Sequence, residues 1–233
     1  MFGCGVAMQV PRAAARRCSG AEPGACEVFT ARAAVRTDPI LRVHGYSEPA
    51  LVRAQIRDVA ERAAALALEL CRPVAWHQEI GILRSDRDRL ILDGGVNLAC
   101  GNVVGLPECA SVVAFVLTVG EAFDDVVHEL NAAGDVLQAL FLETAAWLAI
   151  EGATKDLKAC LRGAAAQRGL RLTRRASPGC AGWPLADHTA FFSLFQGEPM
   201  AVRLLESCAM VPKISRSGMY GLRPLADARP RLA

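Results

Sequence analysis

Hydrophobic residues that recur at helical spacing predict three helices. The first covers residues 47–70, with Ser47 as its N-cap and Pro49 in its first turn, where the missing proline N–H costs nothing. The second covers residues 121–131. The third is long, covering residues 135–167, and its apolar face shifts midway along the helix. This shift predicts a helix that is covered on two sides or one that bends.

Other stretches have strand-like patterns. Residues 35–46 form a short strand-like segment in which Pro39 disfavours a helical residue before it. Residues 74–80 alternate between apolar and polar types, and residues 112–119 form a continuous apolar run typical of a buried strand. The basic run 171–175 is also strand-like. These patterns alone predict a globular domain of mixed class.

The composition suits one folded domain with an N-terminal arm. The chain has 233 residues, and 52% of them are hydrophobic, which is ample for a core. Residues 1–34 are rich in Ala, Arg, Gly and Cys. We expect them to form a flexible extension outside a domain of residues 35–233. No apolar run reaches the roughly 18 residues that a membrane span needs, so no membrane partner is expected.

Net charge and cysteine usage narrow the class of partner. The formal net charge is +2, which does not favour nucleic acid as a partner. The nine cysteines are scattered and include no CxxC pair. Without the spacing of a disulfide framework, a reducing cytoplasm is the expected location. A structural zinc or iron–sulfur site is not expected either, although the cysteines of residues 1–34 leave that alternative open.

A turn after the basic run is the first candidate for ligand binding. Residues 177–180 read Ser-Pro-Gly-Cys, in which proline fixes φ and glycine permits a positive φ. Such a turn can bring backbone N–H groups and the guanidinium of Arg175 close to an anion. A basic loop beside an ordinary helix explains the same residues equally well. A second segment, residues 212–218, has the composition of an irregular binding loop.

Two carboxylates stand in the long predicted helix, Glu143 and Glu151. They are eight residues apart, which is about 800° of rotation, so their side chains lie on neighbouring faces. Each stands among apolar residues, where an ionised carboxylate costs free energy unless it is paired. A solvated helix face is the alternative explanation.

Three other patterns are better explained by structure than by function. His77 lies in a strand-like segment, where a lone histidine is more often structural than a ligand. Residues 85–89 form a charged turn. Residues 93–95, Asp-Gly-Gly, fit no phosphate-binding loop and indicate a turn as well.

Four motifs in the second half of the chain carry a resemblance. They are Arg-x-x-x-Gly (175–179), Pro-x-x-Asp-His (184–188), Glu-Ser-x-Ala-Met-x-Pro (206–212) and Ser-x-Ser-Gly-x-Tyr (215–220). In this order they resemble the C-terminal S-adenosylmethionine-binding activation domain of cobalamin-dependent methionine synthase. The likeness is weaker upstream, where it extends from about residue 36.

The resemblance implies a fold and a ligand site. The fold is of the α+β class, with a curved, mainly antiparallel sheet and long helices packed on it. In the site, Glu151 receives the α-amino group of S-adenosylmethionine and Arg175 receives its carboxylate, which suits a zwitterionic tail. Backbone at Ser177 and Gly179 holds the adenosyl part, and Tyr220 lines the pocket. No catalytic base and no metal ligand is implied, because the methyl donor is already activated and the protein positions it.

The resemblance also implies a role. In that family the domain supplies methyl from S-adenosylmethionine to the cobalt of cobalamin and so rescues oxidised cofactor. This chain lacks the Asp-x-His-x-x-Gly loop that ligates a corrin. We therefore expect a component of a cobalamin-dependent methyltransferase system: a free-standing, cytoplasmic subunit that reactivates cobalamin on a separate corrinoid protein or split methionine synthase. A flavodoxin-like protein is the candidate reductant.

Departures from the family pattern support an alternative function. The family has a tyrosine at the position of Cys180, and further differences fall at Arg223 and Ala228. The alternative is a non-catalytic docking or scaffold partner of a corrinoid methyltransferase that has lost ligand binding. An enzyme acting on a small substrate is a third class, for which the sequence offers no nucleophile–base pair.

Overall fold

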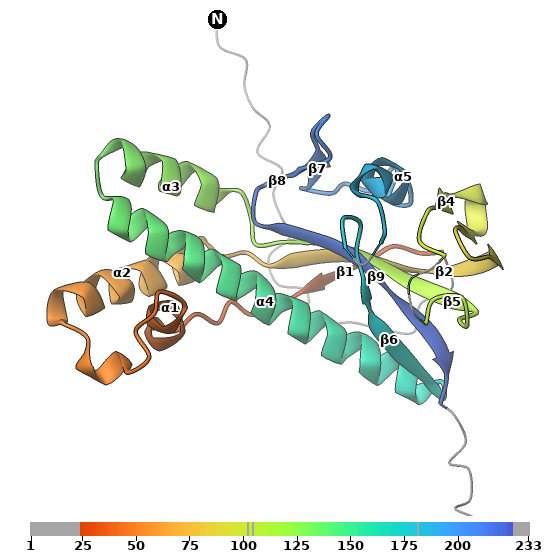
Figure 1. Cartoon of the computed structure of the whole chain (residues 1–233), viewed down its shortest axis with the longest axis horizontal. Helices are drawn as coiled ribbons and strands as arrows, with labels where there is room; N and C mark the ends of the chain where they lie inside the picture. Colours follow the sequence, from red (N-terminus) through yellow and green to blue (C-terminus); the bar gives the residue numbers. More distant parts are fainter. Residues whose placement is uncertain (1–23, 102, 104, 181, 226–233) are drawn as a thin grey trace, which may run out of the picture.

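A seven-stranded antiparallel sheet carries the fold (Figure 1). This computed structural model describes residues 24–101, 103, 105–180 and 182–225. The strands of the sheet are β1 (Glu27–Thr30), β2 (Val74–Ser85), β3 (Leu90–Leu92), β4 (Asn97–Leu98), β5 (Ser111–Thr118), β6 (Leu170–Ala176) and β9 (Ser215–Pro224). A separate two-stranded ribbon pairs β7 (Arg203–Leu204) with β8 (Met210–Val211).

The strand order is β4-β3-β2-β5-β9-β6, and β1 pairs with β2 beside this path. All of these pairings are antiparallel. The first part of β2 pairs with β1, whereas its last part pairs with β3 after a register shift between Ile82 and Arg84. A second register shift lies between Leu172 and Arg175 of β6. Such bulges increase the local twist of a sheet, which agrees with the curved sheet that was expected.

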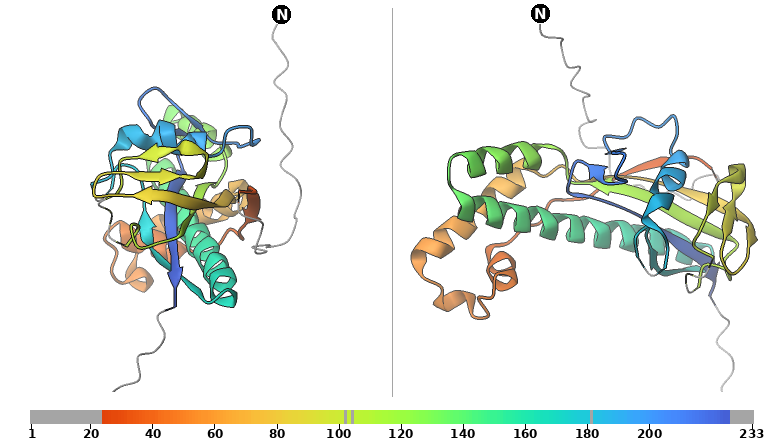
Figure 2. Two further views of the ribbon diagram at one scale, coloured as in Figure 1. Left: turned by 90° about the vertical axis from the view of Figure 1, so that its right-hand side faces the viewer. Right: turned by 45° about the horizontal axis from the view of Figure 1, so that its top comes forward.

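Among the described residues, four helices form a lobe at one end of the sheet and cover one of its faces, while a fifth, short helix packs on the other face. They are α1 (Thr37–Val43), α2 (Ala54–Leu70), α3 (Ala122–Ala132), α4 (Val136–Gln167) and α5 (His188–Ser193), with short 3₁₀ turns at Pro49–Leu51, Asp93–Gly95 and Leu185–Asp187. Figures 1 and 2 show α1, α2 and α3 around the first part of α4, while its second part runs along the sheet. The apolar face of α4 therefore shifts because its neighbours change, and α4 is one continuous helix.

Strand β5 separates two hydrophobic cores because its successive side chains point to opposite faces. Val113, Phe115 and Leu117 pack with the helices α1, α2 and α4. Val112, Ala114 and Val116 pack with the aromatic residues of α5 and the loops on the other side. Both faces of this strand are buried, as its continuous apolar run predicts.

Among the described residues, α4 is also the one helix that is long and apolar enough to cross a membrane, judged by length and composition alone. It has buried residues along its whole length, from Ala139 to Ala165, and many of them belong to the core that faces the sheet. The apolar character of α4 is therefore explained by its place in the core of this domain.

The predicted strand 35–46 is wrong, since α1 occupies Thr37–Val43. Pro39 lies in the first turn of α1, where the missing proline N–H removes no helical hydrogen bond. Ile40 and Leu41 are fully buried and anchor this short helix. The predicted helix 47–70 starts later in the structure than predicted. The chain first makes a 3₁₀ turn at Pro49–Leu51, and α2 starts at Ala54.

The predicted N-terminal extension needs a correction at its end. Residues 1–23 lie outside the described part of the chain, but β1 forms part of the sheet and pairs with β2. Phe29 in β1 is 2% exposed and belongs to the helix-side core. The folded domain therefore starts before residue 35, because a short amphipathic strand with one buried aromatic residue gave too weak a pattern.

Residues 212–218 are not an irregular loop throughout. Strand β9 starts at Ser215 and pairs with both β5 and β6, so Ser217 and Gly218 are central strand residues. This strand was not predicted because its polar residues and glycine interrupt the hydrophobic pattern that is typical of a strand. The other predicted elements are confirmed: residues 121–131 as α3, 135–167 as α4, and 112–119 as β5.

Candidate functional site

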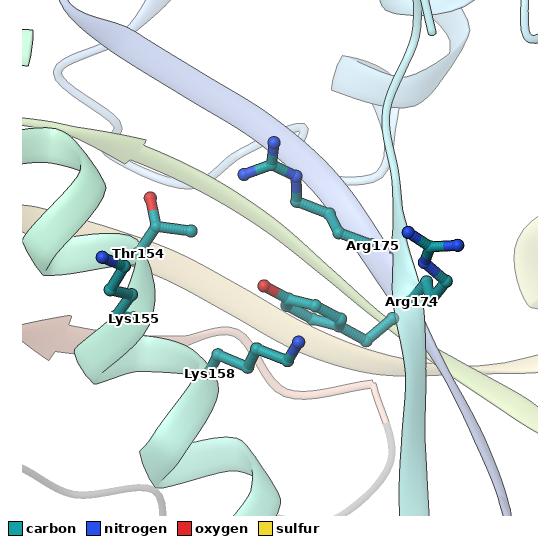
Figure 3. A pocket seen from close by; sticks show the side chains of 6 residues that line it. Thr154, Lys155, Lys158, Arg174 and Arg175 are labelled. Carbon is teal, nitrogen blue, oxygen red and sulfur yellow. The ribbon is translucent and has the colours of Figure 1, made fainter. Parts of the chain in front are cut away.

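A small open pocket lies between the second half of α4 and the strands β6 and β9 (Figure 3). Its volume is about 290 Å³. The lining residues come from all three elements and are mostly cationic; they are Thr154, Lys155, Lys158, Arg174, Arg175 and Tyr220. Arg175 and Tyr220 are two of the residues that the sequence predicted for a ligand site.

The strands place Arg175 beside Tyr220. The two residues are directly opposite each other in the pairing of β6 with β9. Arg174 also lines the pocket, although adjacent strand residues normally point to opposite faces. The register shift between Leu172 and Arg175 accounts for this, because a bulge re-aims the side chains near it.

Helix α4 contributes the other wall through residues at helical spacing. Glu151, Thr154, Lys155 and Lys158 are three or four residues apart along α4, so their side chains follow one side of the helix. Lys158 Nζ lies 5.7 Å from the centre of the Tyr220 ring, within the range of a cation–π contact. Figure 3 shows the Lys158 side chain reaching from α4 towards that ring.

Glu151 follows the same side of α4 without lining the pocket, and it is paired with Arg216 of β9. Glu151 Oε1 lies 2.5 Å from a guanidinium nitrogen of Arg216. Arg216 also donates a hydrogen bond of 3.2 Å to the hydroxyl of Thr154, which in turn donates to the carbonyl of Ile150. The hydrogen bond from Arg216 lowers the pKa of Glu151, burial opposes this, and the charges of Arg216, Arg175 and Lys155 lower it further. Glu151 is therefore an ionised carboxylate near the pocket.

Tyr220 is the buried floor of the pocket. Its side chain is 1% exposed, and its ring stacks on Phe115 with ring centres 5.6 Å apart. Burial raises the pKa of Tyr220, while Arg175 and Arg216 are the largest influences that lower it. The group is therefore a neutral phenol. Its hydroxyl makes no hydrogen bond to any other described residue.

Ser177 and Gly179 lie beyond the end of β6 and are not among the described residues that line the pocket. Ser177 donates a hydrogen bond of 3.0 Å from its hydroxyl to the Ser217 carbonyl. Gly179 has a φ of 84°, and its N–H donates to the Trp183 carbonyl. Of the predicted site residues, Arg175 and Tyr220 line the pocket, whereas Glu151, Ser177 and Gly179 are not part of its lining.

Residues 184–188, which lead into α5, pack beside this turn. His188 is 5% exposed, and its two ring nitrogens lie 2.7 Å from the Ser217 hydroxyl and 2.9 Å from the Cys208 carbonyl. Burial lowers the pKa of His188. Asp187 accepts a hydrogen bond of 2.9 Å from the Trp183 indole. These residues shape the region around the turn, and the histidine is buried away from any substrate.

Glu143, the other carboxylate of the long helix, forms an exposed ion pair. Its Oε1 lies 2.5 Å from Lys213 Nζ, and the side chain is 38% exposed. No group of three His, Cys, Asp or Glu side chains within the described residues is arranged to hold a metal ion. Six described cysteines are free thiols, and Cys180 is exposed. Ala228 lies outside the described residues.

The sequence analysis missed the cationic residues Lys155, Lys158, Arg174 and Arg216. Two signals could have found them. Lys155 and Lys158 follow Glu151 by four and seven residues, which keeps all three near one helical face. Arg216 alternates with Gly218 and Tyr220, and that alternation is visible only when residues 215–220 are taken as a strand.

Comparisons with known proteins were made for sequence and for structure. No family model matches the chain, and no curated protein matches its sequence. Among solved structures, the chain is similar to the crystal structure described as "MetH Reactivation Domain bound to AdoHcy". The match has a TM-score of 0.64 and 16% sequence identity, and it covers 92% of this chain and 85% of that chain. At this identity the likeness shows the fold, and it confirms the expectation from the sequence motifs: this chain has the α+β fold of the MetH reactivation domain.

Proposed function

We propose that this chain is an S-adenosylmethionine-binding subunit. In this role it supports reductive remethylation of cobalamin held by a separate corrinoid protein or a split methionine synthase in the cytoplasm. One observation carries the proposal. Arg175 and Tyr220 line one pocket, and Glu151 stands close enough for the charge of Arg175 to lower its pKa, in a domain whose fold is similar to that of a reactivation domain bound to AdoHcy.

The amino-acid tail of the ligand presents a carboxylate and an ammonium group about 3 Å apart. The planar fork of Arg175 suits the carboxylate, and the hydroxyl of Tyr220 is placed to donate a further hydrogen bond. Glu151 suits the ammonium group, because only its Oε1 is hydrogen-bonded to Arg216. These three groups make the tail the anchored part of the ligand.

In the proposed reaction, the main task of the protein is to position the methyl donor. The methyl group passes from the sulfonium to the reduced cobalt of the partner, the carbon–sulfur bond breaks, and its electron pair stays on sulfur to give S-adenosylhomocysteine. The sulfonium is a good leaving group, so no proton has to move. A pocket without a general acid or base is compatible with this step.

Isothermal titration with S-adenosylmethionine and S-adenosylhomocysteine tests the ligand. We expect saturable binding by the wild type and a loss of about 10–100-fold in Arg175→Ala, since a charged hydrogen bond contributes about 1.5–3 kcal/mol. Arg175→Lys keeps the charge but loses the fork and should lie between the two. Arg171→Ala, on the same strand and outside the pocket, is the matched control. Wild-type heats equal to those of dilution would remove the donor role.

A second assay tests the action on a partner. The chain is added to a corrinoid methyltransferase whose cobalamin is oxidised, together with a flavodoxin-like reductant and S-adenosylmethionine. The absorbance spectrum of the cobalamin reports its methylation. We expect methylation that depends on this chain and is reduced by Arg175→Ala.

Cys180 supports the alternative function. It is exposed in the turn where the resemblance expects a tyrosine, so this turn offers a ligand no aromatic surface. In the alternative, the chain docks on a corrinoid methyltransferase as a scaffold without binding the donor. Complex formation with such a partner, together with the absence of nucleoside binding, would favour this alternative.

A further inference from the structure

The pocket between α4, β6 and β9 has an excess of positive charge that S-adenosylmethionine does not satisfy. Lys155, Lys158, Arg174 and Arg175 line it, and its lining includes no carboxylate. We propose that this pocket binds small oxyanions with two or more negative charges, of the phosphate-monoester or pyrophosphate class.

The balance of charge carries the first part of the argument. Glu151, whose charge acts on Tyr220, is bound to Arg216, so this pair adds no net charge. Four cationic side chains remain in the lining. S-adenosylmethionine carries one carboxylate, one ammonium and one sulfonium, so its net charge is +1. A multiply charged oxyanion compensates the pocket better than a ligand that is itself a cation.

The Tyr220 hydroxyl adds a neutral hydrogen-bond donor to this cationic lining. The residue as a whole is 1% exposed, but its oxygen is not among the buried unpartnered polar atoms of the described residues, so it is open to the pocket. This hydroxyl makes no hydrogen bond within the described part of the chain, and Tyr220 lines the pocket together with Lys158 and Arg175. An oxyanion there would accept its proton.

The shape of the pocket limits the size of the ligand. A volume of about 290 Å³ is at the small end for ligand pockets, which suits a compact anion. Two features bring cationic groups to the pocket: the register shift in β6 directs Arg174 and Arg175 to it, and Lys158 contacts the Tyr220 ring.

This anion site would also regulate the proposed function. Arg175 would serve both the oxyanion and the carboxylate of S-adenosylmethionine, so the two ligands would compete. Phosphorylated small molecules would then lower the occupancy of the donor. This regulatory consequence rests on the proposed function, whereas the anion site itself does not.

Titration calorimetry with inorganic pyrophosphate tests the site, with the whole chain and with sodium chloride adjusted to constant ionic strength. We expect saturable 1:1 binding that weakens about tenfold in Lys158→Gln and several-fold in Tyr220→Phe, which removes the hydroxyl alone. Arg171→Gln removes one charge from the exposed part of β6 outside the pocket and should bind as the wild type does. Wild-type heats without saturation, or an equal loss in Arg171→Gln, would overturn the proposal.

A parallel titration with S-adenosylhomocysteine separates this inference from the proposed function. Pyrophosphate binding without nucleoside binding would leave the anion site standing and remove the donor role. Nucleoside binding without pyrophosphate binding would remove the anion site and leave the donor role standing. Addition of pyrophosphate during the nucleoside titration should raise the apparent dissociation constant, and an unchanged constant would remove the regulatory consequence.

Discussion

Glu151 of α4 and Arg216 of β9 are joined by an ion pair with a 2.5 Å contact at the edge of the candidate pocket. The side chains are 31% and 16% exposed, so water screens the pair only partly. Arg216 also donates to Thr154, which makes it the link between helix and sheet at this point. The resemblance had predicted that Glu151 and Arg175 together hold the two ends of a zwitterionic tail; in the structure Arg216 is the direct partner of Glu151, and Arg175 adds a longer-range attraction.

We expect Arg216→Gln to lower the free energy of unfolding by about 1–3 kcal/mol, because it leaves a partly buried carboxylate without its charged partner. The double variant, in which Glu151→Gln is added to Arg216→Gln, should recover part of this loss, because it no longer contains the unpaired carboxylate. Urea denaturation of the wild type, both single variants and the double variant measures the coupling. Strictly additive losses would mean that the pair does not stabilise the fold.

Gly218 allows β9 to approach the end of β6. A Cβ at this position would lie 2.6 Å from the Ala176 carbonyl oxygen and 2.7 Å from Ser177 Oγ, and φ is 156°. The backbone oxygen cannot move away without breaking the strand pairing. We expect Gly218→Ala to destabilise the domain by about 2–4 kcal/mol. Thermal denaturation followed by circular dichroism measures this loss.

Gly152 is the matched control for that substitution. It lies inside α4, and a Cβ there would meet nothing within 4 Å. Because alanine is a better helix former than glycine, Gly152→Ala should stabilise the domain by about 0.5–1 kcal/mol. If both substitutions lower the melting temperature equally, the close approach at Gly218 is not the cause of its cost.

The elements that sequence analysis predicted well are those whose side-chain pattern is set by burial. Strand β5 is a continuous apolar run because both of its faces are covered, and α4 keeps helical periodicity over its length. Strand β9 was missed because its exposed end is polar and its centre contains Gly218, which close packing against Ala176 requires. A local pattern cannot show such a long-range contact.

The residues of the candidate site were also predicted only in part. Arg175 and Tyr220 were found because they stand in recognisable motifs. Lys155, Lys158 and Arg174 were not, because each is unremarkable in its own segment and becomes part of a site only when α4 packs beside β6. The pairing of Glu151 with Arg216 also depends on that packing, since 65 residues separate the two in sequence.

Cys180 offers a test between the two candidate functions. If the chain binds S-adenosylmethionine, Cys180→Tyr should restore an aromatic surface in the turn and tighten binding by about 0.5–1.5 kcal/mol, the contribution of an aromatic contact. Cys180→Ala controls for loss of the thiol and should leave the affinity unchanged. Titration calorimetry of the three proteins gives the comparison. Absence of binding in all three would favour the scaffold function.

His77 gives the fold a dependence on acid pH. It is 4% exposed in β2, and its Nε2 makes no hydrogen bond to any described residue. The carboxylate of Glu27 lies 4.0 Å away, which is too far for a hydrogen bond. Burial therefore dominates and lowers the pKa of His77 from 6.5 to about 4. The folded state holds this imidazole neutral.

Because the unfolded chain takes up this proton near pH 6.5 and the folded chain only near pH 4, stability falls as the pH drops through that window. We expect a loss of about 2–3 kcal/mol between pH 7 and pH 4.5 from this one group. His77→Phe removes the titrating group but keeps a buried ring. Between pH 7 and pH 4.5, the free energy of unfolding of this variant should therefore fall by about 2–3 kcal/mol less than that of the wild type. His188, whose pKa is also lowered by burial, remains in both proteins and cancels in the difference. Urea midpoints at several pH values measure both curves, and parallel curves would mean that His77 takes up its proton in the folded state at the same pH as in the unfolded chain.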